Sequence, residues 1–316
     1  MKTIVNLLLT RLGVSLVTLL LVSAVVFLIT NLLPGDPAQE MLGQAATPEV
    51  VEALREKLGL NHPPHIRYLN WLGSLLSGDP GVSLANNMPV AELVADRLPR
   101  SLWLAGITTL VAVPFALFVG ILAATYSDSR VDHFISSVVM FIVAVPEFLV
   151  ATAAVLIFAV HLGWLSAVSY APQDPTLREF LATYALPVMT LSLVLVGQMS
   201  RMTRAALIEQ MQQPYVEMAI LKGASQIRLV LRHALPNAVG PIANAVALSL
   251  SYLMGGVVIV EVIFNYPGIA SLMVDSVTNR DFPLLQACAM LFCTGYLMLV
   301  FMADTCAILS NPKLRK

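Results

Sequence analysis

Three acidic residues, Glu147, Glu261 and Asp304, lie in or beside stretches of the sequence that otherwise contain no charge. A charge at the centre of a lipid bilayer costs roughly 2.5–3.5 kcal/mol on insertion scales, so such residues usually face the interior of a helix bundle. Glu147 follows Pro146, which frees a backbone carbonyl and predicts a kink. Glu147 therefore either lines a polar path or is a neutral or paired structural residue. Asp304 is expected to reach the membrane interface.

Two neutral polar residues, Gln198 and Asn244, lie in other apolar stretches. Their default role in a membrane protein is a hydrogen bond between helices. Together with Glu147 and Glu261, they are the candidates for the lining of a path across the membrane.

Recognised catalytic motifs are absent from the sequence. It contains no G-x-x-x-x-G-K-[ST], G-x-S-x-G, H-E-x-x-H or C-x-x-C pattern. The three cysteines, Cys288, Cys293 and Cys306, lie in one apolar stretch at spacings that match no metal motif, so we expect them to be reduced packing residues. We therefore expect no enzyme, no metal site and no cofactor bound by this chain.

The polar segment between the fourth and fifth apolar stretches has the most informative pattern in the chain. Pro214 suits the start of a helix over 215–222, and Gly223 suits the left-handed turn that would end it. A second helix over 225–233 is expected to stop at Pro236. The pattern predicts a helix–glycine–helix elbow. A soluble domain that gripped such an elbow could rock the membrane helices on either side.

Long uncharged windows define the elements that must hold these residues. Hydrophobic residues make up 58% of the 316 and charged residues 12%, about half of the roughly 25% charge of a soluble domain. The windows are apolar on all sides, which favours membrane spans over a soluble helical core. The sequence predicts an all-α integral membrane protein with six spans, over about residues 10–32, 101–126, 134–160, 183–204, 238–264 and 284–308.

Basic residues favour one side of this predicted bundle, and the side rich in Lys and Arg is expected to be cytoplasmic. Both termini then lie in the cytoplasm. Arg201 and Arg204, at the inner end of the fourth span, are expected to reach lipid headgroups. The net charge of −1 gives no basic excess for nucleic acid, whereas the small share of charged residues indicates membrane lipid as a partner. The inner basic residues are Lys2, Arg11, Arg130, Arg201, Arg204, Lys222, Arg228, Arg232, Lys313, Arg315 and Lys316, whereas the short outer loops contain Arg178 and Arg280.

The one long polar stretch lies outside, between the first two spans. It predicts three short helices, one from Thr47-Pro48-Glu49 to Gly59, one over Pro64–Leu76 and one from Pro89 through Leu98. This segment either contacts a soluble partner or only covers the mouth of the bundle. The predicted division is a first transmembrane helix (1–32), an extracytoplasmic helical segment (33–100), a five-helix core (101–310) with a cytoplasmic loop (205–237), and a cytoplasmic tail (311–316).

The polar loop resembles a motif of ABC-importer permeases. Glu217-Met218-Ala219, Gly223 and, after nine residues, His233-Ala234-Leu235-Pro236 follow the pattern E-A-A-x3-G-x9-I-x-L-P, with Met218 and His233 as departures from it. Further segments, in order and along nearly the whole chain, resemble the dipeptide/oligopeptide/nickel branch of these inner-membrane permeases. They are Pro34-Gly35-Asp36-Pro37-Ala38, Leu58-Gly59-Leu60, Gly78-Asp79-Pro80-Gly81-Val82-Ser83, Arg97-Leu98-Pro99, Tyr215-Val216, Glu261-x-x-Phe264-x-x-Pro267-Gly268, Arg280-Asp281-Phe282-Pro283 and Asn311-Pro312-Lys313-Leu314-Arg315.

The resemblance implies a type I ABC-importer fold in the bacterial inner membrane. It implies half of a translocation pathway, with a homologous second permease subunit, two ATPase subunits that bind ATP and Mg, and an extracytoplasmic substrate-binding protein. The implied cargo is a peptide or peptide-like molecule, including the glutathione, opine and nickel-complex classes, and Glu261 matches a position at the outer mouth. The residues implied to couple to the ATPases are Tyr215, Glu217, Ala219, Gly223, Ala224, His233, Leu235 and Pro236.

Two other classes of membrane protein are alternatives to this interpretation. A stand-alone secondary transporter or channel would need no ATPase, but the inverted repeats and interrupted helices typical of such transporters are not evident in the sequence. A membrane enzyme would need a nucleophile and base, and no such pair is apparent.

Overall fold

The computed structural model describes residues 2–32, 38–39, 47–57, 59–169 and 176–310. Residues 34–37, 58 and 311–316, which carry parts of the quoted motifs and the expected tail, lie outside the described residues. Regular structure in the described ranges is helical, apart from one isolated bridge between Val82 and Pro89. The chain divides into two compact units, one formed by Met1–Val14, Leu102–Tyr266 and Tyr296–Lys316, the other by Ser15–Ser101 and Pro267–Gly295.

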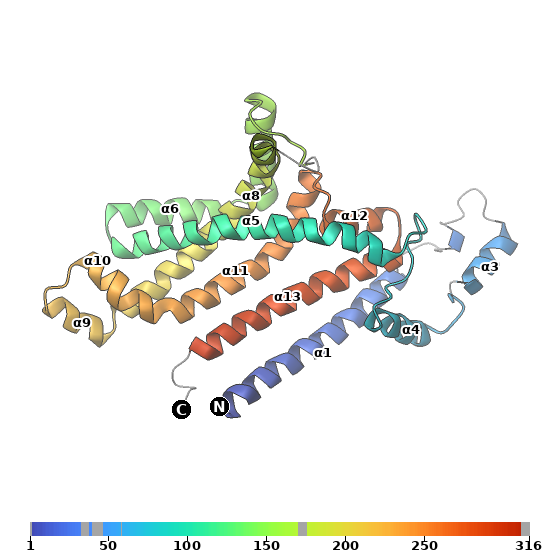
Figure 1. Ribbon diagram of the computed structural model, residues 1–316, viewed down its shortest axis with the longest axis horizontal. Helices are drawn as coiled ribbons and strands as arrows, with labels where there is room; N and C mark the ends of the chain where they lie inside the picture. The colour runs from blue at the N-terminus through green and yellow to red at the C-terminus, as the bar shows by residue number, and fades with distance from the viewer. Residues whose placement is uncertain (1, 33–37, 40–46, 58, 170–175, 311–316) are drawn as a thin grey trace. The chain divides into compact units, whose positions relative to one another are not determined.

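The longest helices have the length and apolar composition of membrane spans (Figure 1). Five helices of the described residues qualify, or six if a bent pair counts as one span. The long helices are α1 (Lys2–Leu32), α5 (Val90–Thr125), α8 (Leu177–Met211), α11 (Leu235–Ile263) and α13 (Phe282–Ser310). The shorter ones are α3 (Pro48–Lys57), α4 (Pro64–Leu76), α6 (Arg130–Ala144), α7 (Glu147–Ala154), α9 (Pro214–Leu221), α10 (Gln226–Arg228) and α12 (Ile269–Thr278), with π-helical turns η2 (Val155–His161) and η3 (Leu229–Ala234).

The predicted third span is broken rather than only kinked. Its two halves, α6 and α7 with η2, meet at an angle of 96°. Val145, the residue before Pro146, has the extended backbone that a following proline favours, with ψ of 125°. The helix therefore ends before Pro146 and restarts at Glu147, which places that carboxyl group at the break.

Two predicted helix ends, at Leu98 and at Pro236, are wrong. The outer helix expected from Pro89 and the span expected from residue 101 form one helix, α5, with Pro99 inside it. Pro236 does not stop a helix either. The residues before it form the π-helical turns of η3, and Pro236 lies in the first turn of α11, so the helix passes through it.

The first unit is organised around α8 and α11. A capping box starts α8, in which Thr176 Oγ1 accepts from the Glu179 N–H and the Glu179 carboxylate accepts from the Thr176 N–H. A buried apolar cluster joins the helices of this unit near the elbow. Its members are Ala124, Ala206, Leu207, Val230, Ala234, Ala238 and Ile242.

The second unit contains the outer segment and the adjoining parts of the long helices. Aromatic rings pack α4 against α1, with Phe27 5.8 Å from Trp71 between ring centroids, and Ser23 Oγ lies 2.8 Å from Tyr68 Oη. The helix α4 spans the predicted residues, Pro64–Leu76.

Asp281, at the start of α13, holds the loop that follows α4. Its buried carboxylate accepts hydrogen bonds from Ser83 Oγ, from the Leu84 N–H at 3.1 Å and from the Ala85 N–H at 3.4 Å. The two motifs that contain Ser83 and Asp281 are therefore in direct contact, although 198 residues separate them. One carboxylate fixes a turn of the outer segment to the start of the last span.

The substitution Asp281→Asn should destabilise this unit, because an amide cannot accept all of these hydrogen bonds. We expect a loss of about 1–3 kcal/mol, the cost of leaving buried donors unsatisfied. Thermal unfolding of the purified protein in detergent would measure it. Asp275→Asn, at an exposed site on α12, is the matched control. Equal unfolding temperatures for the two variants would contradict this role for Asp281.

Candidate functional site

The predicted elbow is formed by α9, a tight turn and the short α10, between the end of α8 and the start of α11 (Figure 1). Gly223 ends α9 with a φ of +78°, the left-handed conformation that the sequence predicts. The Gly223 N–H donates to Ile220 O at 2.8 Å, and the Ala224 N–H donates to Ala219 O at 3.2 Å. This pair of bonds is the Schellman arrangement, and it fixes the angle between the two arms.

The inner face of the elbow is a small apolar core. Val216 and Ala219 of α9 are buried against Leu229 of η3, and Met211 and Ala224 pack around them. This packing makes the elbow a rigid unit rather than a loose loop.

A tyrosine braces the elbow against α8. Tyr215 Oη donates to Gln210 Oε1 at 2.9 Å. Partial burial raises the pKa of the Tyr215 phenol above its ordinary value, so the hydroxyl stays protonated and able to donate. Because Gln210 lies in the last turn of α8, α9 is tied to the end of that helix.

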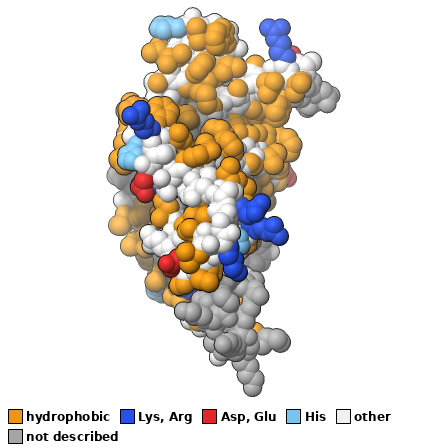
Figure 2. Space-filling view, turned by 90° about the vertical axis from the view of Figure 1, so that its left-hand side faces the viewer, with side chains coloured by type: hydrophobic (Ala, Val, Ile, Leu, Met, Phe, Trp, Pro, Cys, Tyr) orange, Lys and Arg blue, Asp and Glu red, His pale blue; other side chains and the backbone are white. Residues whose placement is uncertain are grey.

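The outer face of the elbow exposes apolar side chains. Leu221 is 75% exposed, Met218 55% and Ile220 52%, and the carboxylate of Glu217 lies exposed on the same short helix. Figure 2 faces the end of the molecule where α9 and α10 lie, and shows hydrophobic side chains over much of it, interspersed with separate basic and acidic groups. An apolar surface that is exposed on a polar loop is typical of a contact with another protein.

The remaining predicted residues of the loop lie between the turn at Gly223 and the start of α11. Ala224 is half-buried in the elbow core, whereas His233 is in the π-helical turns and accepts at its carbonyl from Asn237 Nδ2 at 2.8 Å. Leu235 packs against the buried cluster of the first unit, and Pro236 is exposed at the start of α11. The exposed tip therefore contains Tyr215 and Glu217, while His233, Leu235 and Pro236 join the elbow to the fifth span.

Glu147 lies against a glycine of α11. A methyl group added at Gly256 would lie 2.6 Å from Glu147 Oε1 and 2.8 Å from Oε2, so the carboxylate occupies the space that a side chain at Gly256 would fill. The adjacent Gly255 has no such neighbour within 4 Å. The break after Val145 and the small residue at 256 together place a half-buried carboxylate between α7 and α11.

The other three path candidates are on α8 and α11. Gln198 and Asn244 are half-buried, and Glu261 is fully buried. No hydrogen bond or ion pair joins Glu147, Gln198 and Asn244 to one another in the described part of the chain. The structure therefore does not gather these residues into a single polar cluster.

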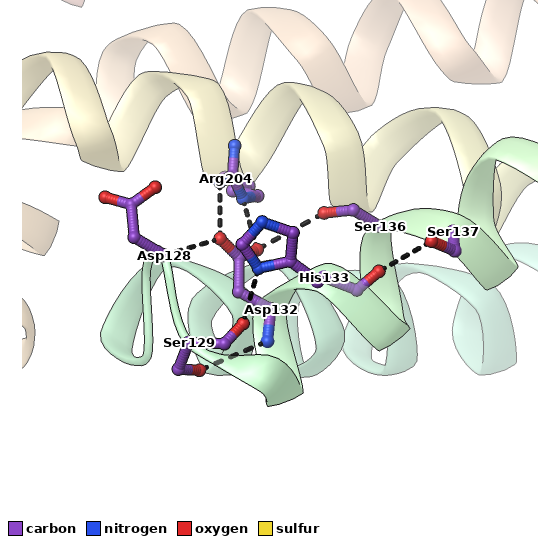
Figure 3. Close-up of polar contacts among 7 residues, drawn as sticks. All are labelled: Asp128, Ser129, Asp132, His133, Ser136, Ser137 and Arg204. Carbon is purple, nitrogen blue, oxygen red and sulfur yellow. Dashed lines mark hydrogen bonds and ion pairs between the residues drawn. The ribbon is translucent and has the colours of Figure 1, made fainter.

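An ion pair with two hydrogen bonds joins α6 and α8 (Figure 3). Arg204 donates from Nε to Asp132 Oδ1 at 2.7 Å and from Nη2 to Asp132 Oδ2 at 2.6 Å. Asp132 also accepts from the Asp128 N–H at 3.0 Å and from Ser136 Oγ at 3.2 Å. The expectation that Arg204 reaches lipid headgroups is thus wrong, because an acidic group on a neighbouring helix binds it. Asp132 was not among the predicted site residues, since its partner is 72 positions away.

The described residues contain no cluster of side chains that could bind a metal ion. No group of three or more His, Cys, Asp or Glu side chains there could hold an ion, and Cys288, Cys293 and Cys306 are free.

Two sequence patterns of one transport family match the chain. The family described as the inner membrane component of binding-protein-dependent transport systems matches residues 116–316, and its N-terminal counterpart matches residues 4–105.

Individual relatives agree with this match. The chain is 33% identical over 298 residues to the glutathione transport system permease protein GsiC of Escherichia coli K12, covering 94% of this chain and 95% of the relative. GsiC of Salmonella typhimurium LT2 is 34% identical over the same shares. Among solved structures, the MetNI methionine ABC transporter in an inward-facing conformation is similar with a TM-score of 0.56 at 15% identity, covering 69% of this chain and 96% of that chain.

The fold neighbour supports the type I importer architecture, and the match to each relative covers 95% of that relative. The all-helical architecture with five or six apolar spans fits both. The chain therefore belongs to the family of binding-protein-dependent inner-membrane transport components, and it is a permease subunit of an ABC importer rather than an enzyme.

Proposed function

We propose that the elbow of α9 and α10 is the surface through which two separate ATPase subunits, which bind ATP and Mg, drive this permease. The observation that carries the proposal is a rigid elbow with an apolar core and an apolar exposed tip. Leu221, Ile220 and Met218 would enter a groove of an ATPase subunit, and Glu217 would orient the contact by its charge. The elbow then lies in the cytoplasm, and so do both termini.

The permease would form half of a translocation pathway with a homologous second subunit. A single chain exposes apolar helix faces, such as Phe141 of α6 at 71% and Leu110 of α5 at 75%, which lipid or a second subunit would cover. An extracytoplasmic binding protein would deliver the cargo to the opposite side from the elbow.

Glu147 is the residue that we propose to line the path. Its carboxylate lies at the break of a span, and half-buried charge at such a position is typical of transport pathways. Gln198 and Asn244 would add polar groups to the lining, and Glu261 would serve at the outer mouth.

The cargo that we propose is a peptide or peptide-like molecule. The carboxylate, amide and ammonium groups of such a molecule suit a path lined by a few polar side chains. Both relatives named above are glutathione permeases, which makes glutathione the first candidate.

Reversing the charge of the elbow should uncouple transport from ATP hydrolysis. In the reconstituted importer, Glu217→Lys is expected to lower both cargo uptake and the ATPase stimulation that cargo-loaded binding protein causes, with membrane insertion intact. Glu56→Lys makes the same charge change at an exposed site of α3 and is the control. Unchanged uptake and stimulation in Glu217→Lys would exclude the elbow as the driven surface.

The two neighbouring glycines of α11 test the role of Glu147. Gly256→Ala should displace the Glu147 carboxylate, whereas Gly255→Ala adds the same methyl group in open space. We expect the uptake rate to fall in Gly256→Ala and to stay at the wild-type value in Gly255→Ala, with equal amounts of assembled complex. Equal uptake by both variants would mean that the position of Glu147 does not matter for transport.

Cargo identity is tested in proteoliposomes that contain the complete importer and its binding protein. ATP-dependent accumulation of labelled glutathione, reduced by an excess of unlabelled tripeptide, is the expected result. If neither glutathione nor any di- or tripeptide is taken up, the proposed cargo class is contradicted. That result would not bear on the elbow, which the Glu217→Lys variant tests separately.

A further inference from the structure

We propose that the ion pair between Asp132 and Arg204 is the link that carries movement of the elbow to the broken span of α6 and α7. The inference rests on the proposed function, because it assumes that the elbow is the driven part. Asp132 and Arg204 belong neither to the elbow nor to the candidate path. Their proposed role is to position the path relative to the elbow.

The geometry of the pair suits a mechanical link. The guanidinium donates two parallel hydrogen bonds to the two oxygens of one carboxylate, which fixes orientation as well as distance. The side chain of Asp132 is only 3% exposed, so water does not compete strongly for it. Ser136 and the N–H of Asp128 hold the same carboxylate to its own helix. Arg204, which is part of α8, connects this carboxylate of α6 to α8.

One end of the link is close to the elbow. Arg204 lies seven residues before Met211, the last residue of α8, which is roughly 10 Å along a helix. The helix α9 begins three residues later, at Pro214, and Tyr215 binds back to Gln210. A force that tilts α9 therefore acts on the end of α8 and on Arg204.

The other end of the link is the base of a rigid arm. Asp132 is in the first turn of α6, which Ser129 caps by accepting from the Asp132 N–H. The helix continues to Ala144, and the break at Pro146 and the carboxylate of Glu147 follow directly. Movement of Asp132 would thus be transmitted along α6 to the residue that lies against Gly256.

A purely structural ion pair is the competing explanation, and it makes a different prediction. Replacing a buried ion pair by apolar residues of similar size is often neutral or stabilising, because the desolvation cost of both charges disappears. The double variant Asp132→Leu/Arg204→Met should therefore fold and assemble. It lacks the paired hydrogen bonds, however, and α6 would be free to slide against α8. The reversed pair Asp132→Arg/Arg204→Asp restores opposite charges at the same sites.

The test measures two distances in the complete importer, reconstituted in lipid with Cys288, Cys293 and Cys306 replaced by alanine. Spin labels at Lys222 in the elbow and at Phe134 on α6 are each paired with a label at Phe118 on α5. In the wild-type background, trapping with ATP and vanadate should shift both distances. In the apolar double variant the elbow shift should remain, the α6 shift should be lost, and cargo transported per ATP should fall. The reversed pair Asp132→Arg/Arg204→Asp should recover part of the α6 shift and part of the cargo transported per ATP.

A second ion pair provides the matched control. Arg11 of α1 and Asp304 of α13 lie 3.2 Å apart and also join two helices, neither of which carries the elbow. The variant Arg11→Met/Asp304→Leu should keep both shifts and the transport ratio. A full α6 shift with normal transport in Asp132→Leu/Arg204→Met would overturn the link. No elbow shift in the wild-type background would overturn the proposed function and the link with it.

Discussion

The ion pair between Asp132 and Arg204 joins α6 to α8, the helix that leads into the elbow. A charge near the end of a membrane helix has three outcomes: it reaches the headgroups, it meets an opposite charge, or it loses its charge. Here an arginine of α8 meets a buried aspartate of α6 with two short hydrogen bonds. That contact ties the first turn of α6 to α8, and the break at Pro146 ends α6 before Glu147 begins the next helix. Asp132 therefore lies in the first turn of α6, and Glu147 follows the break at its other end.

In the second unit a different acidic residue, Asp281, has the same structural role. Asp281 is buried at the start of the last span, and donors from the loop after α4 satisfy it. In both units, a buried carboxylate binds a segment remote in sequence. Without that partner, burying its charge in an apolar environment would cost free energy. These acids hold the fold together, whereas Glu147 and Glu217 lie in positions that suit function.

Much of the fold could be predicted from local pattern, because membrane spans and glycine turns depend on nearby residues. The uncharged windows located the spans, Pro64–Leu76 was predicted to the residue, and Gly223 has its predicted left-handed conformation. The positions of the prolines predicted helix breaks less well. Pro146 breaks its span completely, but the helix passes through Pro236, and Pro99 lies inside a continuous helix. The two polar contacts, one inside each unit, could not be predicted, because their partners lie 72 and 198 positions apart in the sequence and only packing brings them together.

The most direct measurement for the driven elbow is site-specific photo-crosslinking in native membranes. A photoreactive amino acid at Leu221, the most exposed of the large apolar residues of α9, is compared with one at Leu76, which is 79% exposed at the end of α4. The expected result is an adduct between position 221 and an ATP-binding subunit, and no such adduct from position 76. Capture of an ATP-binding subunit from position 76, or of lipid alone from position 221, would contradict the assignment of the elbow as the driven surface.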